Sequence, residues 1–242
     1  MSHIPKILHA VARLLRYPDE STVQSAELLF VVLQGELDEA ALNAARFGAY
    51  VEKHDLSEVE EAFTRTFDIN PMSALEVGWH LFGEEYARGM FLVRMREEMR
   101  KYAIPESVEL PDHLSHVLAI VAAMPEHESR KFVQACVQPA VEKMKLALAD
   151  KESPYRSVIE CLASILKHAW GDPAAASPEG HSEGLGRQPF ASDPLHAFPV
   201  ADVGCSCGTS CNTSSGPTLI QIDQPMEAIP VRLATSLPAR MP

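Results

Sequence analysis

The chain has 242 residues, of which 46% are hydrophobic, and it carries a formal net charge of −12. That size and composition permit one ordinary globular domain with an additional segment, or two small domains. An acidic surface repels nucleic acid phosphates and anionic lipids, so neither is an expected partner. A basic segment of another protein is the kind of partner that this charge attracts.

The first residues lack the basic region, apolar run and cleavage site of a signal peptide. No stretch approaches the roughly 18 apolar residues that would span a membrane. The five cysteines are too few, and odd in number, for a secreted disulfide framework. We therefore expect a cytoplasmic protein without membrane insertion.

Apolar residues recur at helical spacing through most of residues 1–170. The first run ends at Pro18, and a serine three residues before Gln or Glu predicts capping boxes at Ser21, Ser57 and Ser73. The expected helices lie at about 7–15, 21–33, 42–50, 57–67, from 73, 84–102, 112–121, 132–148 and 153–170.

The later helices have the clearer boundaries. Asp112 stands where an N-cap is expected, and Pro139 is a candidate kink in the helix over 132–148. Ser153 is expected to cap the last helix, and Gly171 to end it. The prediction is an all-α fold, with a single helical-bundle domain of eight or nine helices over residues 1–170.

Residues 171–242 have a different composition. They hold ten of the 18 prolines and seven of the 12 glycines, but no lysine. Without sustained apolar periodicity, such a segment does not bury enough surface to fold compactly. We expect a Pro/Gly-rich, largely disordered and irregular C-terminal tail.

The common catalytic and cofactor motifs are missing from the sequence. It has no G-x-G-x-x-G, no P-loop, no H-E-x-x-H, no G-x-S-x-G and no Glu-x-x-His. The last absence counts against a ferritin-like di-iron bundle. The expectation is therefore a protein that is not an enzyme and holds no cofactor.

One cluster in the tail has metal-ligating chemistry. Cys205, Cys207 and Cys211 form a C-x-C-x-x-x-C pattern, and three thiolates on a loop could hold Cu(I), zinc or part of an iron–sulfur cluster. The alternative is that these thiols are incidental. A metal-binding or metal-delivery protein acting through this cluster is the second functional hypothesis.

A set of motifs between residues 63 and 114 carries a family resemblance. Phe63 and Phe67 precede an Asp-x-x-Pro loop formed by Asp68 and Pro71, Arg88-Gly89 follows, and then the run Glu109-Leu-Pro-Asp-His-Leu114. In this order and spacing the motifs resemble the NarJ/TorD/DmsD family, the chaperones that assemble molybdenum-cofactor oxidoreductases. The similarity is greatest to the NarJ branch.

The resemblance implies a system-specific chaperone. Such a protein binds the N-terminal segment, sometimes a twin-arginine segment, of a molybdoenzyme catalytic subunit and assists insertion of the molybdenum cofactor. The enzyme concerned is expected to be a nitrate reductase or a related member of the dimethyl-sulfoxide-reductase superfamily. The chaperone itself is expected to be a monomer or a weak dimer.

Candidate partner-binding residues follow from this resemblance. Asp112 and Glu109 are expected to pair with basic residues of the segment, His113 to tune that pairing with pH, and Pro111 to fix the loop. The alternative is that Asp112 is only an N-cap and His113 only a surface residue.

The apolar candidates are Trp79, Leu81 and Phe82, which could line a groove for a partner helix. Because a helical bundle needs buried aromatic residues, an ordinary core role for these three is the alternative.

Overall fold

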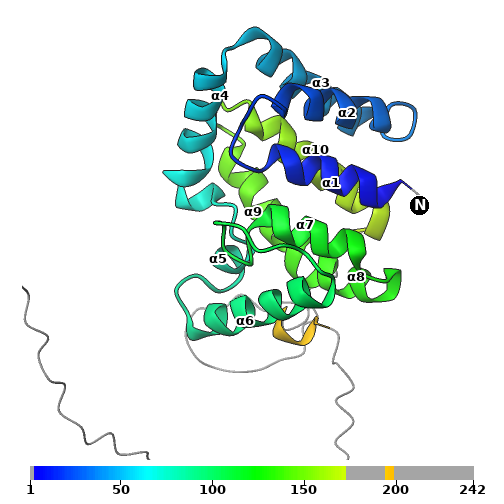
Figure 1. Cartoon of the computed structure of the whole chain (residues 1–242), viewed down its shortest axis with the longest axis vertical. Coiled ribbons are helices and arrows are strands. Elements are labelled where there is room, and N and C mark those ends of the chain that lie inside the picture. Colours follow the sequence, from blue (N-terminus) through cyan, green and yellow to red (C-terminus); the bar gives the residue numbers. More distant parts are fainter. Residues whose placement is uncertain (1–2, 173–193, 199–242) are drawn as a thin grey trace, which may run out of the picture. The chain divides into compact units, whose positions relative to one another are not determined.

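The computed structural model describes residues 3–172 and 194–198 (Figure 1). In these residues the chain is all-α, as predicted, and forms no strand; one isolated antiparallel bridge joins Glu76 and His113. The predicted division at residue 170 into a helical domain and a tail stays a prediction, since most of residues 171–242 lie outside the described part.

The α-helices are α1 Ile4–Leu14, α2 Thr22–Leu33, α3 Asp38–Lys53, α4 Leu56–Phe63, α5 Val77–Phe82, α6 Tyr86–Lys101, α7 Leu114–Ala123, α8 Glu126–Phe132, α9 Gln138–Leu148 and α10 Tyr155–Trp170. Between them lie π-helical turns η1 Thr64–Asp68 and η3 Val133–Val137, and 3₁₀ turns η2 Pro71–Ser73 and η4 Pro194–His196.

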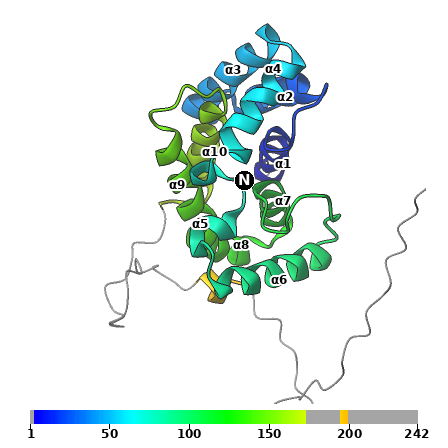
Figure 2. The same cartoon turned by 90° about the vertical axis from the view of Figure 1, so that its left-hand side faces the viewer.

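The bundle is built around α1 and α10. Helix α1 packs on α7 and α2, and α10 packs on α3 and α9 (Figure 1). Apolar side chains from these helices form one connected core, in which Leu8, Phe47, Leu118, Tyr155 and Leu162 are fully buried. The view turned by 90° shows α6 crossing beside α5 at one end of this core (Figure 2).

Helices α8 and α9 are parts of one continuous rod. The π-helical turn η3 joins them without a break, immediately before Pro139. A proline lacks the N–H that an α-helix would use at this point, and a wider turn accommodates that loss. When α8, η3 and α9 are counted as one helix, the described residues contain nine helices, which agrees with the prediction. The π-helical turn η3 lies beside Pro139, the residue expected to kink this helix.

None of the three predicted capping boxes forms as expected, although Ser21 is the N-cap of its helix. Ser21 caps α2 without a side-chain hydrogen bond. The box of α4 is formed two residues earlier than expected, by Asp55 and Glu58. Ser73 lies in η2 and donates its hydroxyl to the carbonyl of Thr66, while α5 begins only at Val77. For α4, Asp55 takes the capping position that was expected for Ser57.

The ends of α10 are closer to the prediction. The hydroxyl of Ser153 accepts a hydrogen bond from the backbone N–H of Tyr155 at 3.2 Å. Gly171 follows the last residue with a φ of +82°, a left-handed conformation that glycine adopts without strain.

Residues 194–198 lie against the bundle, with Ala197 and Phe198 buried. Among the described residues, no helix is both long and apolar enough to cross a membrane.

Candidate functional site

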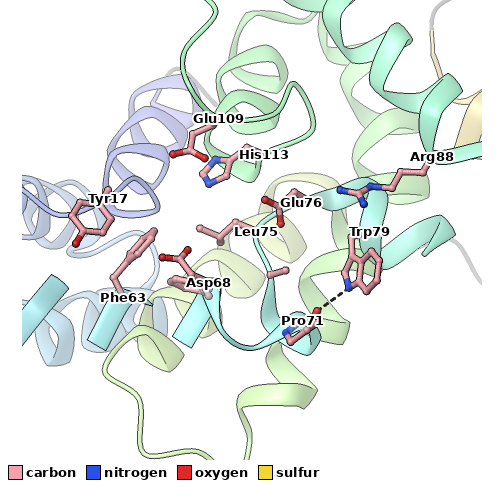
Figure 3. A pocket seen from close by; sticks show the side chains of 12 residues that line it. Tyr17, Phe63, Asp68, Pro71, Leu75, Glu76, Trp79, Arg88, Glu109 and His113 are labelled. Carbon is pink, nitrogen blue, oxygen red and sulfur yellow. Dashed lines mark hydrogen bonds between the residues drawn. The ribbon is translucent and has the colours of Figure 1, made fainter. Parts of the chain in front are cut away.

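A pocket of about 480 Å³ opens where the C-terminal end of α1, the turns after α4, helix α5 and the loop before α7 come together (Figure 3). Its lining residues are Tyr17, Phe63, Phe67, Asp68, Pro71, Ala74, Leu75, Glu76, Trp79, Arg88, Glu109 and His113. They come from segments up to about a hundred positions apart in the sequence. Most of the motifs that carried the family resemblance contribute to it.

One wall of the pocket is aromatic. Tyr17 and Phe67 each pack edge-on against Phe63, with ring centroids 5.6 and 5.1 Å away. The buried ring of Tyr155 packs behind Phe63 and Phe67, at 5.4 and 5.2 Å. Because Tyr17 is half exposed while Phe63 and Phe67 are nearly buried, the wall presents a firm apolar surface with one accessible ring at its edge.

Three carboxylates face the pocket, those of Asp68, Glu76 and Glu109 (Figure 3). None of them makes a side-chain hydrogen bond or ion pair with another described residue. Arg88 is the only cation among the lining residues, because burial lowers the pKa of His113 to about 3 and keeps that imidazole neutral near pH 7. The pocket is therefore acidic, and its acidic groups are available to an external cation.

Asp112 ties the two sides of the site together. Its carboxylate accepts a hydrogen bond from the N–H of Gly78 at 3.0 Å, and its carbonyl accepts one from the N–H of Val77 at 2.9 Å. The N–H of Leu114 in turn donates to the carbonyl of Leu75 at 2.8 Å. These bonds join the start of α5 to the loop before α7 across 34 positions of sequence.

Asp112 therefore caps a helix, but not the expected one. It was predicted to cap the helix that follows it, whereas it satisfies the N-terminus of α5. The side chain is fully buried, and that burial raises its pKa to about 6 in spite of the nearby charge of Arg88. One carboxylate oxygen has no hydrogen-bond partner among the described residues, and the same holds for Nε of Arg88. Asp112 lies behind the pocket surface rather than on it.

His113 is the N-cap of α7. Its Nδ1 accepts a hydrogen bond from the N–H of Ser115 at 3.3 Å and lies 2.8 Å from the hydroxyl of the same residue. The side chain is 4% exposed and borders the pocket. Burial lowers the pKa of His113 to about 3, which argues against a change of its charge near neutral pH, and its predicted role in partner binding stays a prediction.

The other predicted residues divide between pocket and core. Glu109 and Trp79 line the pocket, and Trp79 Nε1 donates to the carbonyl of Pro71 at 2.9 Å. Leu81 is buried, Phe82 packs on Phe91 at 5.5 Å, and Pro111 is buried behind the loop. Leu81, Phe82 and Pro111 thus support the pocket without lining it.

Several lining residues were not among the predicted site residues. Phe63, Phe67, Asp68 and Arg88 had a signal, since they belong to the motifs of the family resemblance. Tyr17 had none, because it is separated from those motifs by three helices of sequence.

A second cavity, of about 400 Å³, lies between α9 and α10. Its charged groups are already paired: Lys145 with Glu142 at 3.2 Å and Lys167 with Asp172 at 2.8 Å. The second cavity therefore has no charged lining residue that lacks an ion-pair partner, whereas the three carboxylates of the first pocket form no ion pair with a described residue.

No group of three metal-ligating side chains comes together in residues 3–172 and 194–198. The predicted metal ligands Cys205, Cys207 and Cys211 lie outside this range.

By its fold and its pocket, this is an all-α protein with a concave acidic site that has one aromatic wall. A family model described as nitrate reductase delta subunit matches residues 33–159, which is 127 of the 242 residues. The chain belongs to this family, and the resemblance found in the sequence is confirmed.

Two curated relatives carry the name nitrate reductase molybdenum cofactor assembly chaperone NarJ, from Escherichia coli strain K12 and from Escherichia coli O157:H7. Each is 24% identical over 163 residues, which are 66% of this chain and 69% of the relative.

Proposed function

We propose that this protein is an assembly chaperone for the molybdenum cofactor of a nitrate reductase or a related molybdoenzyme. In this proposal it binds the N-terminal segment of the catalytic subunit in the acidic pocket and performs no covalent chemistry. Family membership and the name of the curated relatives support the general role. The chemistry of the pocket supports the particular ligand.

The observation that carries the proposal is the set of three carboxylates that form no ion pair with a described residue, in a pocket that also has an aromatic wall. Asp68, Glu76 and Glu109 would attract a basic side chain. The half-exposed ring of Tyr17, at the edge of the aromatic wall, would contact the apolar part of the same segment. A volume of about 480 Å³ holds a few side chains rather than a folded domain. The ligand is therefore an anchor of mixed basic and apolar character.

The surface beside the pocket extends this match. Ile69 and Met72, each 69% exposed, and Leu110, 44% exposed, belong to the segments that form the pocket's rim. Such exposed apolar residues are suited to the apolar face of an amphipathic helix whose basic residue enters the pocket. The net charge of −12 would also favour encounter with a basic segment.

Calorimetry with a peptide from the N-terminus of the catalytic subunit tests the proposal. Glu76→Gln combined with Glu109→Gln keeps the shape of the pocket while removing two charges. We expect the double variant to weaken binding by roughly tenfold to a hundredfold, corresponding to about 1.4–2.8 kcal/mol, and to reduce the dependence on salt.

Glu142→Gln in the second cavity is the matched control and should leave the affinity unchanged. Equal affinity of the double variant and the wild type would place the ligand elsewhere. Failure of every candidate catalytic-subunit peptide to bind the wild-type protein would reject the proposed ligand. Cytoplasmic location and a monomeric or weakly dimeric state stay predictions from the sequence.

A further inference from the structure

Residues 194–198 lie on a surface formed by Phe91 of α6, Phe132 of α8 and Cys136 of η3, which we term the groove. The 3₁₀ turn η4, orange in Figure 2, lies beside α6. Ala197 is 8% exposed and Phe198 6% exposed, so these two residues are buried although 21 residues, 173–193, separate the segment from Asp172.

Aromatic rings form the floor of this groove. The ring of Phe198 lies between Phe91 of α6 and Phe132 of α8, with centroid distances of 5.4 and 5.2 Å. Both partner rings have no exposed surface, and their full burial includes the cover that Phe198 provides. Without the segment, the rings of Phe91 and Phe132 would present aromatic surface to water.

A polar contact fixes the other end of the segment. The thiol of Cys136, in η3, donates to the carbonyl of Pro194 at 3.7 Å. The segment therefore has a contact at its first residue, through the backbone carbonyl of Pro194, and another at its last, through the ring of Phe198.

The balance of forces favours reversible docking of this segment. Ordering five residues costs conformational entropy of the same order as the gain from burying one phenylalanine and two small residues. A thiol is also a weak hydrogen-bond donor. The covalent connection to α10 offsets part of the entropy because it keeps the segment near the groove. For a helix of the core, by contrast, the gain from burying apolar side chains is not so nearly offset by the entropy of ordering the chain.

We propose that the groove between α6 and η3 is a peptide-docking site whose ligand is this chain's own segment 194–198, held there reversibly. The segment covers the aromatic floor in the resting protein and leaves it without unfolding the bundle.

Cysteine alkylation in the full-length protein tests this proposal, with the extent of reaction at each cysteine followed by mass spectrometry. Cys136 faces the segment, whereas Cys161 is buried within α10 and serves as the internal control. Phe198→Ala should accelerate alkylation of Cys136 by about tenfold or more and leave Cys161 protected, because only the groove opens.

A peptide corresponding to residues 191–201, added to the Phe198→Ala protein, should restore protection of Cys136. The same peptide with alanine at position 198 should not. Phe198→Leu in the full chain, which keeps an apolar anchor, should fall between wild type and Phe198→Ala.

Three results would overturn the proposal. Equal Cys136 rates in the wild type and Phe198→Ala would show that the segment does not cover the groove. Parallel acceleration of Cys136 and Cys161 would show that the segment is an integral part of the fold. Protection by a catalytic-subunit peptide but not by the 191–201 peptide would assign the groove to that partner instead.

Discussion

Replacing Gly78 with alanine tests the link between α5 and the loop before α7. A methyl group on Gly78 would lie 2.7 Å from a carboxylate oxygen of Asp112 and 3.0 Å from the ring of Phe91. Neither neighbour has room to retreat, because both side chains have no exposed surface. The substitution must therefore break the hydrogen bond that caps α5 or displace a core ring.

The magnitude follows from two costs and one smaller gain. Overpacking a core costs typically about 1–3 kcal/mol. Loss of a hydrogen bond to a buried carboxylate costs about 1.5–3 kcal/mol, while alanine returns up to about 1 kcal/mol through its helix propensity. We expect Gly78→Ala to lower the free energy of unfolding by roughly 2–4 kcal/mol, and the melting temperature by roughly 5–15 °C for a protein of this size.

Gly89 supplies the matched control on the neighbouring helix. It is exposed, and a methyl group there would meet no described atom within 4 Å. Gly89→Ala should therefore raise stability by about 0.5–1 kcal/mol. Thermal denaturation followed by circular dichroism measures both variants under the same conditions.

A double-mutant cycle separates the clash from the lost cap. Asp112→Ala removes the atom that the new methyl group would strike, so Gly78→Ala should cost much less in that background than in the wild type. If Gly78→Ala proved as harmless as Gly89→Ala, the reasoning about this contact would be refuted.

Two further predictions concern buried polar groups. In the fold the pKa of His113 is lowered to about 3 from 6.5, so the wild type should lose stability as the pH falls from 6.5 toward 3, by up to roughly 5 kcal/mol from this group. His113→Asn keeps a capping side chain but cannot titrate, and urea denaturation between pH 4 and 7.5 should show a flatter dependence. The buried hydroxyl of Tyr155 has no hydrogen-bond partner among the described residues, so Tyr155→Phe should raise the melting temperature by an amount corresponding to about 1 kcal/mol. Tyr102→Phe, which removes a 3.0 Å bond to Glu128, should lower it.

Each of these predictions has a clear contrary result. Parallel pH curves for wild type and His113→Asn would show that the imidazole is solvated in the native protein. A loss of stability in Tyr155→Phe similar to that in Tyr102→Phe would show that the buried hydroxyl has a partner.

The helices were accessible from sequence because periodicity is a local property. The sequence predicts a buried face of α6 formed by Phe91, Leu92, Met95 and Met99, of which Leu92 is partly buried and the other three are buried. The same reasoning predicted that the region 132–148 is helical and that Pro139 disturbs it.

The caps were less accessible because their donors and acceptors are chosen by tertiary structure. Ser73 had the correct spacing for a local cap, but a carboxylate 34 positions after Gly78 satisfies the N-terminus of α5. No local pattern distinguishes an aspartate that caps its own helix from one that caps another.

The pocket was predictable only in part for a similar reason. The family motifs indicated the loop at Glu109 and the turn at Asp68, yet their approach depends on how α5 packs. Tyr17 and Phe198 reach their places through contacts across long stretches of sequence, and single-residue patterns carry no such information.

The central claim is that the acidic pocket binds the N-terminal segment of a molybdoenzyme catalytic subunit. The protein has two tryptophans: Trp79 lines the pocket, and Trp170 is buried, with its indole N–H donating to the hydroxyl of Ser129 at 3.2 Å. Incorporation of fluorotryptophan gives one ¹⁹F resonance for each, assigned with Trp79→Phe. Titration with the catalytic-subunit peptide should shift the Trp79 resonance and leave that of Trp170 in place. A peptide that binds by calorimetry but leaves the Trp79 resonance unmoved would contradict the claim.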